Sequence, residues 1–314
     1  MPKITIIGAG NVGAQAAFYA AIKNLADIVL IDVIDGVPQG KALDIQQAMP
    51  IAGSNVKIIG SNEYALSKDS DIVVVTAGVP RKPGMTREDL IAINAKIMNS
   101  VIKEVVKYSP NTILIIVSNP LDAMVHLAYK LSGFPKERVM GMAGCLDSAR
   151  FRTFIAQELS ANVNEVEAMV LGSHGDFMVP IVNLCKVKGK PISSLLPPQK
   201  VDAIIERVRN GGAEIVNYLK TGSAFFAPGL AIIEMVEAIL KDQHKVLPCS
   251  VLLEGEYEVN ELFIGVPVKL GRKGVEKIIK LDLSEAEKKE FEKSVRKTKE
   301  LVEKLGHIIS YPRN

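Results

Sequence analysis

The first 145 residues alternate short apolar runs with amphipathic segments, and this alternation restricts the fold more than any other feature of the chain. Strands that alternate with helices form βαβ units, in which the strands are parallel and the crossovers right-handed. The pattern therefore predicts an α/β fold with a doubly wound parallel sheet. We expect strands at 3–7, 28–33, 56–59, 72–76 and 113–117, and helices from residue 11 and near 39–48, 88–107 and 121–131.

The pattern changes after residue 144. The second half shows fewer, longer helices between strands, which is typical of an α+β domain. Its last helix is marked by Ser284 and Glu287, which have the spacing of a capping box. We therefore expect a first domain at 1–144 and a second, catalytic domain at 145–314. In the second we expect a helix from about 148 and strands near 166–171, 181–187, 246–255 and 262–269.

The composition excludes several classes of partner. The formal net charge is only +3 and the lysines are mixed with glutamates, so no nucleic-acid surface is expected. Three widely spaced cysteines favour a reducing compartment over a disulfide framework. An apolar strand begins at residue 4, which leaves no room for a signal peptide, and Glu234 and Glu237 interrupt the apolar stretch near 227–240. We expect a cytoplasmic protein that does not bind membranes.

A glycine-rich GxGxxG turn joins the first strand to the first helix. If the chain binds a dinucleotide, Gly8 would make the tight turn, Gly10 would let the backbone approach a pyrophosphate, and Gly13 would let the helix pack closely. Asp32 ends the second strand, about 20 residues on, where a carboxylate can bind an adenosine ribose. No arginine follows it to bind a 2′-phosphate, so NAD is favoured over NADP, although a flavin or a nucleotide-free turn fits this motif alone. The turn comprises Gly8, Ala9, Gly10, Asn11, Val12 and Gly13.

One of the four histidines has an unusual setting. His174 follows an apolar strand and is flanked by the small residues of Gly172-Ser173-His174-Gly175, which would leave its ring accessible. Histidine is the commonest acid–base group in catalysis, but a histidine in a turn is often structural. Taken alone, the segment leaves both interpretations open.

A carboxylate and a guanidinium group lie three residues apart on an expected helix. Asp147 and Arg150 can form a local ion pair. Alternatively, Asp147 orients His174 and stabilises its imidazolium, while Arg150 binds a carboxylate through two parallel hydrogen bonds. Asn119 ends another apolar strand, where it can cap the next helix or face a ligand beyond the strand ends.

Two arginines follow the strand at 72–76. Ligands of open α/β sheets bind beyond the carboxyl ends of the strands, so Arg81 and Arg87 suggest an anionic substrate. The alternative is that Arg81 is a solvated loop residue.

Several motifs occur in one order along almost the whole chain: GAGNVG, TAGVPRKPGMTREDL, VSNPLD, LDSARFR, GSHGD and the stretch at 222–228. In these motifs the chain resembles the lactate/malate dehydrogenase family, and within it the malate dehydrogenases of the lactate-dehydrogenase-like group. The resemblance implies an N-terminal NAD-binding Rossmann domain and a C-terminal catalytic domain. It also implies dimers or tetramers, with a tetramer preferred, and a role in the tricarboxylic acid cycle.

The resemblance also implies a role for each matching residue. His174 would accept and donate the proton, with Asp147 as its orienting partner. Arg150 would bind the C1 carboxylate of the substrate, and Arg87 would polarise the reacting carbonyl from a loop that closes over the site. Asn119 would touch both substrate and cofactor. The NAD site would comprise Gly8, Ala9, Gly10, Asn11, Val12, Gly13, Asp32, Asn94, Val117, Ser118 and Asn119.

Arg81 bears on the choice of substrate. The resemblance places it where lactate-specific relatives carry a glutamine that faces the methyl group of pyruvate. A buried arginine opposite a methyl is an unpaired charge, whereas the second carboxylate of oxaloacetate would match it. We therefore expect reversible, NAD-dependent oxidation of (S)-malate to oxaloacetate. A lactate or broad 2-hydroxyacid dehydrogenase, and an NAD-binding protein without turnover, remain the alternatives.

No metal is expected, because no HExxH or clustered His/Cys spacing occurs.

Overall fold

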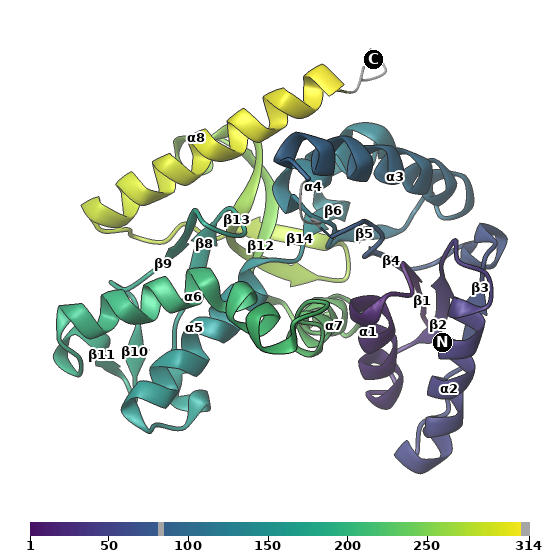
Figure 1. Cartoon of the computed structure of the whole chain (residues 1–314), viewed down its shortest axis with the longest axis horizontal. Coiled ribbons are helices and arrows are strands. Elements are labelled where there is room, and N and C mark those ends of the chain that lie inside the picture. The colour runs from purple at the N-terminus through teal and green to yellow at the C-terminus, as the bar shows by residue number, and fades with distance from the viewer. Residues whose placement is uncertain (81–84, 309–314) are drawn as a thin grey trace.

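Six parallel strands form the N-terminal part of the main sheet in the computed structural model, which describes residues 1–80 and 85–308 (Figure 1). Their order is β3-β2-β1-β4-β5-β6, and every neighbouring pair is parallel. This order is that of a dinucleotide-binding doubly wound fold, so the predicted fold class is confirmed. The strands are β1 (Lys3–Ile7), β2 (Asp27–Ile31), β3 (Ile58–Ser61), β4 (Ile72–Val75), β5 (Ile113–Ile116) and β6 (Val139–Gly141).

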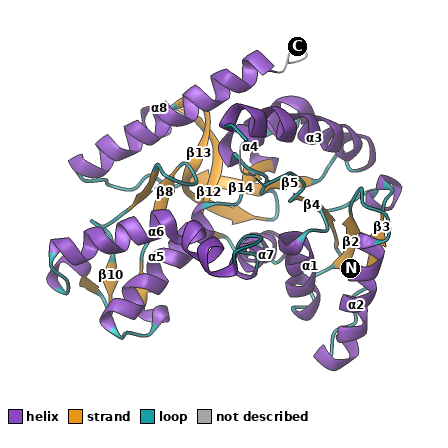
Figure 2. Ribbon diagram, viewed as in Figure 1, coloured by secondary structure: helices purple, strands orange, loops and turns teal. Residues whose placement is uncertain are grey.

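Both faces of the parallel sheet are buried under helices (Figure 2). Ile72 and Val74 face a core that contains side chains of α1, α2 and α7, whereas Val73 and Val75 face a core with side chains of α3 and α4. This two-sided burial explains why the strands read as continuous apolar runs. The helices are α1 (Asn11–Ile22), α2 (Val37–Ala52), α3 (Arg87–Tyr108), α4 (Leu121–Ser132), α5 (Gly144–Leu159), α6 (Pro198–Leu219), α7 (Phe226–Leu240) and α8 (Glu285–Ile308).

The main sheet continues into the C-terminal half of the chain. β6 joins β12 through one antiparallel pair, Gly141 with Ser250. A Cβ atom on Gly141 would lie 3.0 Å from the Cβ of Ser250 and 2.6 Å from a methyl of Val125, so glycine permits this close approach. The sheet then runs through β12 (Lys245–Glu254), β13 (Asn260–Gly271), β8 (Val170–Gly172) and β9 (Met178–Pro180), and β14 (Gly274–Ile278) pairs with β13.

The predictions of one strand near 166–171 and one near 181–187 are wrong. The segment at 166–171 divides into β7 (Val166–Glu167) and β8, which belong to different sheets. The segment at 181–187 contributes only β10 (Lys186–Val187), which pairs with β7 and β11 (Lys190–Pro191). Before β10 the chain turns at Asn183, whose backbone N–H donates to Glu287 at 2.9 Å. Apolar runs therefore did not reveal where the chain passes from one sheet to another.

The helix ends show two outcomes. α5 begins at Gly144, before the expected start near 148, and a Cβ atom on Gly144 would lie 2.7 Å from the Cβ of Pro248. The capping box of α8 is confirmed: the backbone N–H of Ser284 donates to Glu287 at 2.8 Å, and the Glu287 N–H donates back to the Ser284 hydroxyl at 3.4 Å. Within residues 1–80 and 85–308, no helix has the length and apolar character that crossing a membrane requires.

Candidate active site

The glycine turn after β1 has the shape of a phosphate-binding turn. Gly8 has a φ of +107°, and a Cβ atom on Gly13 would lie 1.9 Å from the Gly8 carbonyl oxygen, so both positions require glycine. A Cβ atom on Gly10, by contrast, would meet no atom within 4 Å. Gly10 is the N-cap residue of α1, so open space lies beside a helix N-terminus, where backbone N–H groups favour an anion.

Asp32 lies beside this turn, directly after β2. Its carboxylate accepts hydrogen bonds from the backbone N–H groups of Ala9 at 2.6 Å and Ile34 at 3.0 Å. The side chain is only half-buried, so the carboxylate can also reach the hydroxyl groups of a ribose. The open space at Gly10, the helix N-terminus and Asp32 together fit a dinucleotide.

A cavity of about 540 Å³ lies beyond the carboxyl ends of β1, β4 and β5. It brings together residues that the sequence analysis chose from separate motifs. The chosen residues that line it are Gly10, Asn11, Val12, Gly13, Asn94, Val117, Ser118, Asn119, Arg150 and His174. The chosen residues Gly8, Ala9, Asp32 and Asp147 do not line it.

His174, which lines this cavity, contacts the buried carboxylate of Asp147. His174 Nδ1 lies 2.9 Å from Asp147 Oδ2, and the Asp147 side chain is 2% exposed against 24% for His174. The negative charge of Asp147 is the largest cause that raises the pKa of His174 above its ordinary value, against the opposing effect of burial. Because Nδ1 faces Asp147, Nε2 is the nitrogen available to exchange a proton with a ligand.

Arg150 contacts the same carboxylate from the side of the cavity. Its Nη1 lies 3.4 Å from Asp147 Oδ1, so the local ion pair and the histidine contact coexist. Burial lowers the pKa of Arg150, and its side chain is only 14% exposed. A partly buried guanidinium that lines the cavity is suited to bind a carboxylate.

Two asparagines connect the loop after β4 to the end of β5. The amide of Asn94 accepts from the backbone N–H of Val79 at 2.8 Å and donates to the Asn119 carbonyl at 2.7 Å. The Ser118 hydroxyl donates to the Ala77 carbonyl at 2.5 Å. These side chains therefore fix the cavity wall through backbone groups. The peptide bond between Asn119 and Pro120 is cis.

The structure describes little of Arg81 and Arg87, the two arginines after β4. Arg81 lies outside the described residues, and so does the side chain of Arg87. α3 begins at Arg87 and is capped by Thr86, whose hydroxyl accepts from the backbone N–H of Asp89 at 3.0 Å. Arg87 therefore belongs to the first turn of the helix that follows the loop.

Asp122 is a buried carboxyl beside the pair that the sequence analysis missed. It is 5% exposed, and the Ser250 hydroxyl donates to it at 2.6 Å. Burial raises its pKa to about 6, while Ser250 and the backbone amide of His174 favour its charged form. It thus links α4 and β12 to the loop of His174. The signal in the sequence was one carboxylate within an otherwise apolar helix segment.

The sequence analysis also missed two features of the C-terminal half, because each depends on a contact between distant segments. Gly211 in α6 lies against Arg150: a Cβ atom there would be 3.1 Å from the arginine Cδ. The stretch at 222–228, which contributed only to the resemblance, supplies the cavity wall opposite the glycine turn. The wall residues from this half include Gly212, Val216, Gly222, Ser223, Ala224 and Pro228.

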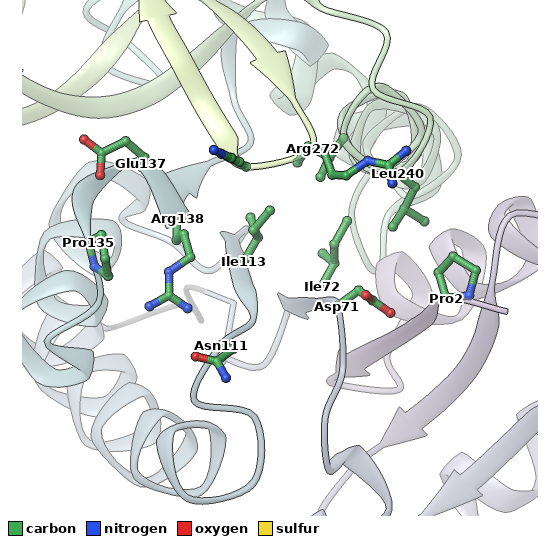
Figure 3. A pocket seen from close by; sticks show the side chains of 12 residues that line it. Pro2, Asp71, Ile72, Asn111, Ile113, Pro135, Glu137, Arg138, Leu240 and Arg272 are labelled. Carbon is green, nitrogen blue, oxygen red and sulfur yellow. The ribbon is translucent and has the colours of Figure 1, made fainter.

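A second cavity, of about 560 Å³, lies at the opposite, amino ends of the strands (Figure 3). Asp71, Arg138 and Arg272 border it around a floor that includes Ile72 and Ile113. None of the described residues that line it is a histidine, and it therefore offers no counterpart to the Asp147–His174 pair. The active site is assigned to the cavity at the carboxyl ends.

A group of possible metal ligands lies near the second cavity. His244 Nδ1 is 2.8 Å from Glu276 Oε2, and Asp242 accepts the backbone N–H of Arg272 at 2.7 Å. The cluster lies on the side of the sheet away from His174. That the reaction needs no metal stays a prediction.

The fold and the cavity define the class of the protein: a dinucleotide-binding α/β enzyme with an acid–base pair beside the cofactor cleft. Residues 2–141 match the family model described as lactate/malate dehydrogenase, NAD binding domain, and residues 145–308 match the alpha/beta C-terminal domain of the same family. The chain belongs to the lactate/malate dehydrogenase family.

Individual relatives within this family differ in substrate. A curated malate dehydrogenase from Pelodictyon phaeoclathratiforme is 54% identical over 308 residues, 98% of this chain and 99% of the relative. The solved structure of Cryptosporidium parvum malate dehydrogenase has a TM-score of 0.95 and 46% identity over 98% of this chain and 99% of that one. Cryptosporidium parvum lactate dehydrogenase, complexed with lactic acid and NAD, has a TM-score of 0.94 and 44% identity over 97% and 98%. Likeness of fold alone therefore does not select the substrate.

The glycine turn predicts two different effects of the same substitution. Gly10→Ala adds a methyl to open space, so we expect only the small loss of thermal stability that a weaker N-cap causes, but NADH affinity that is weaker by about tenfold or more. Gly13→Ala forces a methyl onto the Gly8 carbonyl and should lower the melting temperature. Gly40→Ala, within α2, where a Cβ also meets nothing within 4 Å, is the control: it should leave NADH affinity unchanged and, because alanine favours a helix over glycine, should not lower the melting temperature. Unchanged NADH affinity in Gly10→Ala would contradict the placement of the cofactor phosphates.

Proposed function

We propose that this chain is an NAD-dependent malate dehydrogenase that reversibly oxidises (S)-malate to oxaloacetate. The observation that carries the proposal is the Asp147–His174 contact of 2.9 Å, formed beside the cavity that the glycine turn also lines. Binding of NAD alone requires no buried carboxylate that raises the pKa of a histidine. This argues against an NAD-binding protein without turnover. The curated relative at 54% identity supports the choice of malate.

In the proposed reaction His174 moves the proton. Neutral His174 takes the proton of the C2 hydroxyl at Nε2, and Asp147 stabilises the imidazolium that forms. In the reverse direction the imidazolium returns this proton to the carbonyl oxygen of oxaloacetate. Bound NAD supplies the acceptor for the C2 hydride.

Arginine and asparagine side chains would hold the substrate. Arg150 binds its C1 carboxylate, and Asn119 contacts it from the end of β5; both line the cavity. Arg87, in the first turn of α3, places positive charge where the alkoxide-like oxygen develops. By the family resemblance, Arg87 would close over the bound pair, which would exclude water and align the reacting groups.

The proposed NAD site runs from the turn of Gly8, Ala9, Gly10, Asn11, Val12 and Gly13 to the end of β5. Asp32 binds the adenosine ribose at one end. Asn94, Val117, Ser118 and Asn119 border the other end, next to His174.

Substrate choice is assigned to Arg81. Arg81, in the TAGVPRKPG segment, supplies one guanidinium in addition to those of Arg87 and Arg150. Its charge would pair with the second carboxylate of oxaloacetate. A lactate or broad 2-hydroxyacid dehydrogenase is the second candidate, because a lactate dehydrogenase is nearly as similar in fold.

Further proposals concern organisation and place in the cell. We propose a Rossmann domain at 1–144 and a catalytic domain at 145–314, which the two family matches support. A cytoplasmic homotetramer that acts in the tricarboxylic acid cycle follows from the family resemblance. Strongly exposed apolar side chains, such as Ile51 at 91% and Phe226 at 61%, are consistent with subunit contacts, and light scattering measures the oligomeric state.

Selectivity for oxaloacetate should depend on Arg81. The wild-type protein should oxidise NADH faster with oxaloacetate than with pyruvate. Arg81→Gln should reduce the ratio of the two kcat/KM values by about 30-fold to several thousandfold, or about 2–5 kcal/mol, as for loss of a buried charge pair. Arg296→Gln, an exposed arginine of α8, is the matched control. An unchanged ratio would remove Arg81 from this role.

The pH dependence of oxaloacetate reduction should change when the contact between His174 and Asp147 is removed. Oxaloacetate reduction needs the imidazolium, so kcat/KM should be high at low pH and fall as pH rises through the raised pKa of His174. Asp147→Asn removes the largest cause of that increase, so the fall should occur at lower pH. Asp202→Asn, an exposed carboxylate of α6, should leave the profile unchanged. A profile of Asp147→Asn that coincides with the wild type would refute the electrostatic role of Asp147.

A further inference from the structure

The backbone of Ala9, in the middle of the glycine turn, is held by two side chains of opposite charge. Its N–H donates to Asp32 Oδ2 at 2.6 Å, and its carbonyl accepts a hydrogen bond from Lys41 Nζ at 2.7 Å. Lys41 comes from the second turn of α2 and is half-buried. A carboxylate and an ammonium group are therefore both fixed within one residue of the turn.

These two charges lie at the end of the dinucleotide site that meets the adenosine ribose. NAD and NADP differ only there, by a 2′-phosphate. Asp32 and the exposed Asp35 would repel such a phosphate, whereas Lys41 would attract it. The sequence offered no arginine after β2, but it did not show that a lysine of α2 reaches the turn.

We propose that Lys41 is a specificity-determining residue for the cofactor, and that it forms a latent site for a 2′-phosphorylated dinucleotide which the charge of Asp32 keeps closed. Removal of that one charge should then admit NADPH without any new cation. The inference rests on dinucleotide binding by the family's NAD binding domain and is independent of malate as the substrate.

A purely structural role of Lys41 makes a different prediction. If its ammonium only holds the Ala9 carbonyl, its loss should disturb the turn and weaken NADH and NADPH equally. If it also meets the 2′-phosphate, its loss should weaken NADPH more than NADH, because NADH has no group there.

The test is a double-mutant cycle on the full chain without substrate. Dissociation constants for NADH and NADPH are measured from the fluorescence of the bound reduced nicotinamide, which is undisturbed by protein indole because the chain contains no Trp. The proteins are the wild type, Asp32→Asn, Lys41→Met and the double variant. Lys57→Met, an exposed lysine just before β3, is the matched control, and the melting temperature of each variant verifies folding.

Asp32→Asn should bind NADPH about 30-fold more tightly than the wild type does, as expected when a like-charge contact is removed. Adding Lys41→Met should weaken NADPH binding to Asp32→Asn by about tenfold or more, and should weaken NADH binding by clearly less than that. NADPH binding to Asp32→Asn should also weaken with salt. Three results would overturn the proposal: no gain for NADPH in Asp32→Asn, equal losses for both cofactors on removal of Lys41, or no loss at all.

Discussion

The burial of the Asp147 carboxylate against His174 is the interaction on which the rest of the site depends. A carboxylate that is 2% exposed requires charged or hydrogen-bonding partners, and His174 and Arg150 supply them. α5 can present Asp147 because Gly144 lets the helix pack against Pro248. The loop of His174 follows β8, which pairs with β13 of the main sheet. The C-terminal half thus places Asp147 and His174 at the cavity beyond the carboxyl ends of the parallel strands.

This arrangement separates the common chemistry from the choice of substrate. The scaffold that carries the Asp147–His174 pair and the glycine turn is similar to those of a malate and a lactate dehydrogenase, with TM-scores of 0.95 and 0.94. In our proposal the choice of substrate depends on Arg81, which precedes α3 in the sequence, while Arg87 is the first residue of that helix. In the same proposal the choice of cofactor depends on the charges of Asp32 and Lys41 beside Ala9.

The sequence predicted what depends on local pattern and missed what depends on distant contacts. The buried runs of β1, β4 and β5 and the capping box of α8 were predicted because each signal lies within a few residues. Asp147 and His174 were identified as candidates, but only the fold brings these residues, 27 apart in sequence, into contact. The division of 166–171 between two sheets, the contact of Asp122 with Ser250 and the reach of Lys41 to Ala9 could not be predicted, because no local pattern encodes a tertiary partner.

The most direct test of the central claim is the substitution His174→Asn, because an asparagine amide can still donate to the buried Asp147 while it cannot act as the acid or base. NADH affinity and oxaloacetate reduction are measured on the same preparation. The account predicts that NADH binds with nearly wild-type affinity and that kcat for oxaloacetate falls by about 10²–10⁴-fold. Turnover close to that of the wild type would contradict the assignment of His174 as the proton donor and acceptor.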